Sequence, residues 1–375
     1  MLSIATIFCT VIPCVIQGVV VGSPSSCKEH PSIPDEVLAI ANRTIRLPGV
    51  PSSEVVEQAE NCQRVKRVLP KENFTALFTH ANQGKGIHDG LRYTYEKFLQ
   101  AVAKYPYFCN DAAGKADSDS LDDICRTELA TLFAHFAQET GERAPPNEDF
   151  WLEALWFFEE NGCTPTACQY CDADSSKNWF KCRDGVGYWG RGALQLSWNF
   201  NYGPFSIAMH GNASVLLDNP GLIIEDWQIF ASAIYFYMTP SGLFPSMHDV
   251  VTGHWKPNQH DIDQHRIPGF GVTTLIVNGF IECGKGEESY QSKSRMTYYH
   301  NFMNYFGVTP EGQDGCAEMK PFDHESASAL MKYWDYAKND EGCFGTTNAT
   351  AYSVFDDPYN QDEAYCRCVR KEAPY

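Results

Sequence analysis

Residues 187–204, GYWGRGALQLSWNFNYGP, are the most informative stretch of this chain. They interleave aromatic rings with side-chain amides, a hydroxyl group and four glycines. A sugar-binding surface needs this mixture, because aromatic faces pack on pyranose rings and amides bond their hydroxyl groups. Glycines let the backbone approach a ligand closely. We therefore expect this stretch to line a carbohydrate site.

Two clusters that combine carboxylates with aromatic rings lie upstream of this stretch. Residues 134–141 read AHFAQETG, and residues 155–161 read LWFFEEN. A pair of carboxyl groups supplies the acid and the base in glycosidic bond cleavage. Together with the sugar-binding stretch, these clusters point to a glycoside-cleaving enzyme.

The first cluster follows an amphipathic helical pattern. Apolar side chains recur at i, i+3, i+4 and i+7 in Leu129, Leu132, Phe133 and Phe136. Glu139 continues that apolar stripe, and Gly141 offers a stop for the helix. A carboxylate on such a stripe is either salt-bridged in the core or directed at a cleft.

Helical patterns dominate the rest of the chain as well. Apolar residues have helical spacing over 93–102, over 226–238 before Pro240, and over 272–280. An acidic loop over 110–123 is bracketed by cysteines that could close it. Strand-like alternation is scarce, so we predict a mainly α fold of the α+β kind, with short irregular or β pieces around residues 187–204.

The composition excludes some partners. The chain has 375 residues, 43% of them hydrophobic, and a net charge of −18. A nucleic acid needs a basic face, and no cluster of Lys and Arg supplies one. The acidity suits a neutral polymer such as a polysaccharide, or serves solubility alone.

The ends of the chain differ in character from its middle. Residues 1–23 read as a secretory signal peptide, although a transmembrane anchor is an alternative. Residues 24–68 are punctuated by prolines and are expected to form an irregular extension. Residues 69–316 hold the motifs of a catalytic domain, and residues 317–375 form a cysteine-containing tail with no assigned role.

The cysteines agree with an extracellular location. Removal of residues 1–23 leaves thirteen of the fifteen cysteines, so at least one thiol is free or pairs elsewhere. The group of cysteines within residues 163–182 could bind zinc, but its irregular spacing and the secreted context favour disulfides. Glycosylation sequons occur at Asn42, Asn73, Asn212 and Asn348.

Five motifs carry a resemblance to one family. They are YTYEKF at 93–98, QETG at 138–141, residues 187–204, PGFGVT at 268–273 and IVNGFIECG at 276–284. In this order they resemble the glycoside hydrolase family 19 chitinases, typified by the plant class I and II endochitinases. The resemblance covers the chain from Leu69 to Cys316.

This resemblance implies a lysozyme-like helical core of two lobes with a substrate cleft between them. It also implies a monomeric enzyme that hydrolyses β-1,4-linked N-acetylglucosamine polymers with inversion, and that requires no metal or organic cofactor. The partners would be chitin or chitooligosaccharides. An inverting pair of carboxyl groups stands roughly 6.5–9.5 Å apart, which leaves room for the attacking water.

The resemblance also implies roles for individual residues. Glu139 matches the general acid, and its apolar surroundings are consistent with that role. Glu159 fits the general base best, Glu160 is the close alternative, and Glu142 and Glu153 are weaker candidates. Ser197 matches the serine that positions the attacking water.

Substrate contacts are implied for Gln195, Asn201, Asn278, Glu282 and Arg295. Glu282 and Arg295 could instead form a structural ion-pair network. Tyr188 and Trp189 offer rings for stacking, or belong to the core. Two departures from the family pattern, Gln138 directly before the acid and Phe200 in place of a tyrosine, put substrate positioning in question.

Two other functions compete with an endochitinase. One is a catalytically weakened, lectin-like chitin-binding protein, and the other is a lysozyme-type hydrolase of peptidoglycan. The relative placement of Glu139, the pair Glu159 and Glu160, and Ser197 discriminates an enzyme from a binding protein.

Overall fold

The structure of the chain is a computed structural model. It describes residues 39–84, 91–114, 117–141, 150–172 and 180–330, except positions 41, 242 and 324, and three short strands beyond them. The expected signal peptide lies outside the described residues, as do most of the tail and the candidate Glu142. Within the described residues, no helix is long and apolar enough to cross a membrane.

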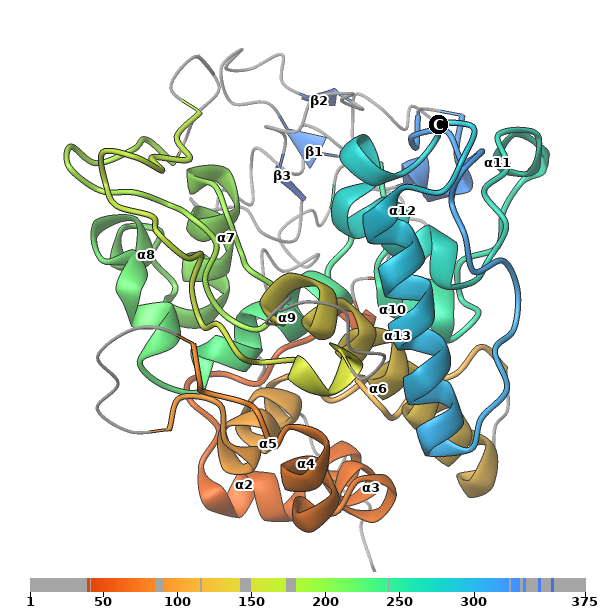
Figure 1. The fold of residues 1–375 in the computed structure, drawn as a ribbon, viewed down its shortest axis with the longest axis horizontal. Helices are drawn as coiled ribbons and strands as arrows, with labels where there is room; N and C mark the ends of the chain where they lie inside the picture. The colour runs from red at the N-terminus through yellow and green to blue at the C-terminus, as the bar shows by residue number, and fades with distance from the viewer. Residues whose placement is uncertain are drawn as a thin grey trace, which may run out of the picture.

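Helices dominate the described part, which confirms the predicted mainly α class (Figure 1). The α-helices are α2 (Ser53–Gln58), α3 (Glu60–Val68), α4 (Lys71–Leu77), α5 (Tyr95–Lys104), α6 (Ser118–Thr140), α7 (Asn199–His210), α8 (Ser214–Asp218), α9 (Gln228–Met238), α10 (Met247–Val251), α11 (Gln259–Asp263), α12 (Phe270–Glu282) and α13 (Tyr290–Phe306). Three 3₁₀ turns are η2 (Phe150–Glu153), η3 (Pro220–Ile224) and η4 (Ala327–Leu330). A small antiparallel sheet has the order β2-β1-β3, from β1 (Tyr333–Trp334), β2 (Cys343–Phe344) and β3 (Tyr352–Ser353).

The predicted irregular extension over residues 24–68 is wrong for its last part, which forms α2 and α3. The Ser52 side chain caps α2 by accepting a hydrogen bond from the Val55 backbone N–H. In α3 only one narrow face, which includes Cys62 and Val65, is buried. Because both helices are short, their apolar periodicity extends over too few residues to stand out in the sequence.

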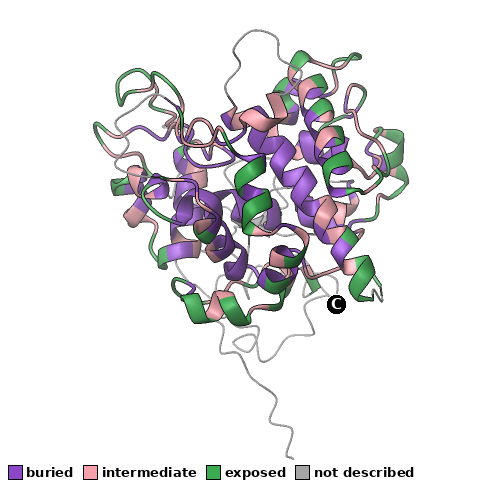
Figure 2. Cartoon of the chain, turned by 60° about the horizontal axis from the view of Figure 1, so that its bottom comes forward, coloured by how far each residue is buried: buried purple, intermediate pink, exposed green. Residues whose placement is uncertain are grey.

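Helix α6 forms the centre of the fold and packs along α13 (Figure 1). The Asp117 carboxylate caps its first turn, and its backbone ends at Gly141, the predicted stop. The Phe133 ring lies 4.9 Å from Phe78 and 5.7 Å from Phe302 between ring centroids, both in edge-on geometry. Figure 2 shows buried residues concentrated in the helices at the centre of the molecule.

Disulfides form as predicted within the described residues. One joins Cys109 to Cys125 and closes the acidic loop. The cysteines considered for zinc binding instead pair as Cys163–Cys168 and Cys171–Cys182, and a further disulfide joins Cys283 to Cys316. Cys62 is a free thiol, and burial raises its pKa to about 12, so it is not a reactive thiolate at neutral pH.

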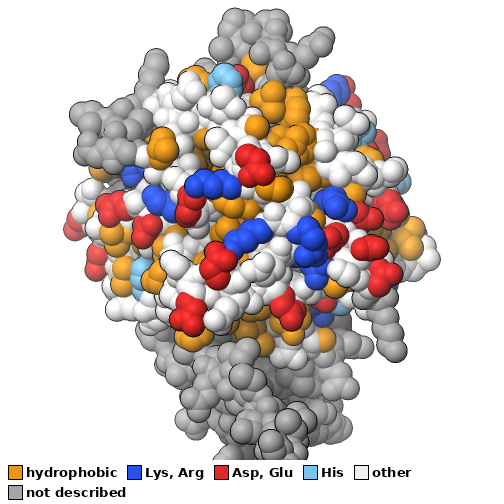
Figure 3. All heavy atoms as spheres, turned by 90° about the horizontal axis from the view of Figure 1, so that it is seen from below, with side chains coloured by type: hydrophobic (Ala, Val, Ile, Leu, Met, Phe, Trp, Pro, Cys, Tyr) orange, Lys and Arg blue, Asp and Glu red, His pale blue; other side chains and the backbone are white. Residues whose placement is uncertain are grey.

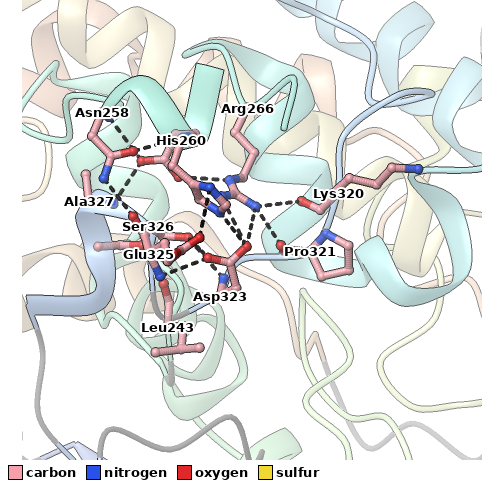
Figure 4. Close-up of polar contacts among 12 residues, drawn as sticks. Leu243, Asn258, His260, Arg266, Lys320, Pro321, Asp323, Glu325, Ser326 and Ala327 are labelled. Atoms are coloured by element: carbon pink, nitrogen blue, oxygen red, sulfur yellow. Dashed lines mark hydrogen bonds and ion pairs between the residues drawn. The ribbon is translucent and has the colours of Figure 1, made fainter. Parts of the chain in front are cut away.

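The segment that follows Cys316 packs against the helical domain through the ionic cluster of Figure 4. Arg266 is completely buried, with its Nε 2.8 Å from the Asp261 carboxylate and its Nη1 2.6 Å from the Pro321 carbonyl oxygen. The same guanidinium faces Asp323, whose carboxylate also lies 2.8 Å from His260 Nε2. The first part of the predicted tail is therefore anchored to the domain.

The surface seen from below mixes charges of both signs (Figure 3). Lys and Arg side chains alternate with Asp and Glu side chains there. Such a face does not generate the single-sign positive field that a phosphate backbone requires.

Candidate active site

Glu139 lies in the last turn of α6, and its carboxylate pairs with Arg295 of α13. The Glu139 side chain remains 23% exposed, whereas the Arg295 side chain is only 1% exposed. The guanidinium therefore holds the carboxylate from the core side and leaves part of it open to solvent. The two alternatives for the Glu139 side chain, a salt bridge in the core and a position facing a cleft, therefore do not exclude each other.

Arg295 is fixed in turn by Glu282 at the end of α12. The Arg295 Nε lies 2.9 Å from Glu282 Oε2, and the Arg295 Nη2 lies 2.8 Å from Glu282 Oε1. Both side chains are buried. Glu282 and Arg295 form the ion-pair network that was the alternative to a substrate contact, and this network holds Glu139 from its inner side. A contact of either residue with substrate stays a prediction.

His135 is a further member of this network whose role the sequence analysis missed. Its Nδ1 lies 3.1 Å from Arg295 Nη1, and its Nε2 lies 2.9 Å from the Thr273 hydroxyl. Because a guanidinium only donates, Nδ1 accepts and Nε2 carries the proton. Burial, reinforced by Arg295, holds the His135 pKa well below its ordinary value. The side chain is a neutral bridge between α6, α12 and α13.

Asn278 connects the same network to a kink in α12. Its backbone is non-helical, with φ −149° and ψ 30°, and its Nδ2 donates to Glu282 Oε1 over 2.8 Å. The side chain is only half-buried. Its position beside the ion pairs is compatible with the predicted contact to sugar, although one of its amide hydrogens is already used.

Glu159 and Glu160 lie on a short bridge that pairs Glu159 with Arg191. The Glu159 carboxylate accepts from Trp189 Nε1 over 3.0 Å and lies 3.6 Å from the Nε of the buried Arg191. The Glu160 carboxylate accepts from the Tyr170 hydroxyl over 2.8 Å and from the Gly190 backbone N–H over 3.3 Å. Since successive residues of an extended segment point to opposite sides, the two carboxylates occupy different surroundings.

Gln195 and Ser197 lie in the turn that leads into α7, and Asn201 lies in the first turn of that helix. The Ser197 hydroxyl donates to the Gln195 carbonyl oxygen over 2.9 Å, and Asn201 Nδ2 donates to the Ser197 carbonyl oxygen over 2.9 Å. All three side chains are half-buried. Gln195 has a positive φ of 50°, an uncommon conformation for a residue that is not glycine. The structure thus gathers three of the predicted polar contacts at the start of α7.

An aromatic group borders this turn. The Trp198 ring, partly exposed, stacks on Phe200 with 5.7 Å between centroids and meets the Tyr170 ring edge-on at 5.2 Å. Tyr188, which was also predicted to bind substrate, is completely buried, and its hydroxyl donates to the Leu217 carbonyl oxygen. This burial favours the alternative that Tyr188 belongs to the core, and its contact with substrate stays a prediction. The Trp189 ring is covered by the Arg191 guanidinium, 3.9 Å from its centroid.

The two departures from the family pattern have different surroundings. Gln138 is buried within α6, so it does not reach solvent beside Glu139. Phe200 contributes to the aromatic group described above. Glu153, one of the weaker candidates for the base, lies on η2, and its Oε2 is 3.5 Å from His80 Nδ1.

Comparison with known proteins now decides the family. Residues 68–316 match the model of glycoside hydrolase family 19, described as chitinase class I. The chain belongs to this family. The match contains every motif on which the resemblance rested.

Plant chitinases are among the relatives of this family 19 chain. Over 269 residues it is 35% identical to Chitinase 2 of Oryza sativa subsp. japonica, which covers 72% of this chain and 74% of the relative. Over 261 residues it is 34% identical to an endochitinase of Carica papaya, covering 69% of this chain and 99% of the relative. The crystal structure of a family 19, class IV chitinase of Zea mays aligns with 66% of this chain and with 97% of the Zea mays chain. The sequence identity is 27% and the TM-score is 0.47.

Proposed function

We propose that this family 19 protein is a secreted, monomeric endochitinase that hydrolyses β-1,4-N-acetylglucosamine linkages with inversion. The observation that carries the proposal is the partly exposed Glu139 carboxylate at the end of α6, backed by the buried Arg295 and Glu282. A carboxyl group that is fixed on its inner side and open on its outer side can meet a glycosidic oxygen without changing its own position.

In this mechanism Glu139 protonates the leaving glycosidic oxygen. A second carboxylate, on the opposite face of the sugar, takes a proton from the attacking water. Ser197 would orient this water through its hydroxyl, and Gln195, Asn201 and Asn278 would bond the sugar amide and hydroxyl groups. Each of these side chains is partly exposed, as a substrate contact requires.

The contacts of Glu159 and Glu160 favour Glu160 as the general base. The Glu159 carboxylate is engaged by the buried Arg191 guanidinium and by the Trp189 ring N–H. Glu160 accepts only from a phenol and a backbone amide among the contacts above. Gly190, whose N–H bonds Glu160, also packs closely against the Gln195 side chain. Glu160 therefore belongs to the same group as the predicted sugar contacts.

Secretion rests on separate evidence. The described residues hold disulfides, which form and persist in oxidising compartments. The sequons at Asn42, Asn73 and Asn212 place their asparagines on the exposed surface, where a glycan can be attached. Both features suit the pathway that the apolar residues 4–21 indicate.

The test is hydrolysis of N-acetylglucosamine hexamer, with the anomers of the products followed by NMR. Wild-type protein should release the α-anomer first, and Glu139→Gln should lose at least about 100-fold in kcat, as expected for loss of a general acid. Glu160→Gln should lose activity to a similar extent, with a smaller loss for Glu159→Gln. Initial release of the β-anomer would refute inversion. Hexamer binding without turnover by the wild type would favour the lectin-like protein instead.

A further inference from the structure

The Glu160 carboxylate receives its strongest hydrogen bond from a residue outside its own segment. The Tyr170 hydroxyl approaches Glu160 Oε1 to 2.8 Å, while the Gly190 N–H approaches Oε2 only to 3.3 Å. Two donors at two oxygens fix the plane of a carboxylate. We propose that Tyr170 is a positioning residue that orients the Glu160 carboxylate toward the attacking water. This inference rests on the proposed function, in which Glu160 is the general base.

The backbone of Tyr170 is held in an unfavourable conformation. Its φ is +46°, in the left-handed region, which is sterically unfavourable for a bulky residue of this kind. Such strain persists only where the surroundings over-determine it, and it concentrates at functional sites. The strained backbone is thus a second observation, independent of the hydrogen bond, that sets Tyr170 apart from an ordinary surface tyrosine.

The surroundings of Tyr170 supply that constraint from both sides. Cys171, the next residue, is linked to Cys182, and the preceding turn is closed by Cys163–Cys168. The Tyr170 carbonyl oxygen accepts from the Asn199 N–H over 3.3 Å at the start of α7. Its ring meets Trp198 edge-on. The hydroxyl group is therefore held at a fixed place relative to the turn that contains Ser197.

The Tyr170 hydroxyl is suited to donate throughout the neutral range. Burial raises its pKa to about 12, and the hydrogen bond to Glu160 acts in the same direction. A phenol that stays protonated offers its hydrogen to the carboxylate and adds no charge that would compete for it. This supports a role in orientation, and Tyr170 itself transfers no proton to the substrate.

The experiment compares kcat and KM of wild type and Tyr170→Phe on N-acetylglucosamine hexamer. The phenylalanine ring keeps the contact with Trp198 and removes only the hydroxyl group. We expect kcat to fall about 10- to 100-fold, because small misplacements of a catalytic group have effects of this size, while KM and the thermal midpoint stay unchanged. The matched control is Tyr95→Phe, which deletes another hydroxyl, one that donates to the Leu69 carbonyl oxygen over 2.6 Å in the core. It should lower the thermal midpoint and leave kcat unchanged.

A double variant separates this inference from the function on which it rests. If Tyr170 acts through Glu160, then Tyr170→Phe causes little further loss in the Glu160→Gln background. Full activity of Tyr170→Phe together with an inactive Glu160→Gln overturns the inference and leaves the proposed base intact. Full activity of Glu160→Gln overturns the base, and the inference with it. Equal multiplicative losses in both backgrounds show that Tyr170 acts independently of Glu160 and also overturn the inference.

Discussion

Arg295 shows how a single residue can combine stability with positioning. Its guanidinium spans Glu139, which is partly exposed, and Glu282, which is buried. A planar fork with five N–H donors can serve two carboxylates and the His135 ring at once. A buried pair of this kind adds little net stability, but removal of one partner leaves an uncompensated charge.

We predict that Arg295→Lys impairs catalysis despite keeping the charge. An ammonium group cannot reproduce the two-pronged contact with Glu282 while it also reaches Glu139. The expected result is a fall in kcat of at least about tenfold and a loss of about 1–3 kcal/mol in the free energy of unfolding, as for lost hydrogen bonds to charged groups. Hexamer hydrolysis and urea unfolding measure the two effects.

The matched control is Arg126→Lys. Arg126 pairs with Asp123 on the exposed surface of α6, where such pairs contribute about 0–1 kcal/mol. It should leave both kcat and stability unchanged. Wild-type kcat in Arg295→Lys would show that simple charge suffices and that the two-pronged geometry has no catalytic role.

At the scale of elements, the sequence predicts those helices whose apolar residues recur at helical spacing. Helices α6, α9 and α12 appear where the periodicity placed them. The kink at Asn278 lies at an Asn-Gly dipeptide, a turn signal that apolar spacing alone does not report. Similarly, the turn before α7 depends on positive φ values at Gln195 and Trp198, which their residue types do not announce.

Glycine at position 203 is required by the packing of α7. A Cβ there would lie 2.0 Å from the Phe180 ring, which is itself fully buried. We predict that Gly203→Ala lowers the free energy of unfolding by about 1–3 kcal/mol or more, because an overfilled core must displace its neighbours. Thermal denaturation checks this. Gly221→Ala is the control, since its nearest atom would be 3.7 Å away; an equal loss in both variants would mean that the contact with Phe180 is not the cause.

For the whole molecule, the predictable and unpredictable parts of the site have different physical origins. Motif identity was enough to propose Glu139, Ser197 and their neighbours. The burial of a site residue could not be predicted from its motif, because burial depends on how helices that are distant in sequence pack together. Tyr188, Glu282 and Arg295 are residue types that also occur on protein surfaces, yet all three are buried here. The same holds for the choice between Glu159 and Glu160, which are adjacent in sequence and differ only in the partners that the fold brings to them.

A second buried ionic cluster ties α6 to α10 and to the loop before α6. His248 of α10 lies between two carboxylates, with Nδ1 2.6 Å from Glu128 Oε1 and Nε2 3.4 Å from Asp111 Oδ2. Asp111 also lies 2.9 Å from His254 Nε2, and Glu128 Oε2 accepts from the Cys109 N–H. Burial alone would lower the His248 pKa, but the charge of Glu128 and the two hydrogen bonds outweigh it and raise the pKa to about 10.

This cluster predicts a loss of stability at alkaline pH. The His248 pKa is raised above its unfolded value of about 6.5, so its contribution is fully present below pH 6.5 and is lost as the pH rises toward 10. Between pH 6.5 and 9 the loss should be on the order of 2–3 kcal/mol in the free energy of unfolding. Urea unfolding at both pH values measures it. In His248→Gln this part of the pH slope should disappear, while His300→Gln, which removes an exposed histidine paired with Asp314, should keep it. An unchanged slope in His248→Gln would mean that the buried imidazole loses no proton on unfolding in this range, and the cluster would then be held by a neutral histidine.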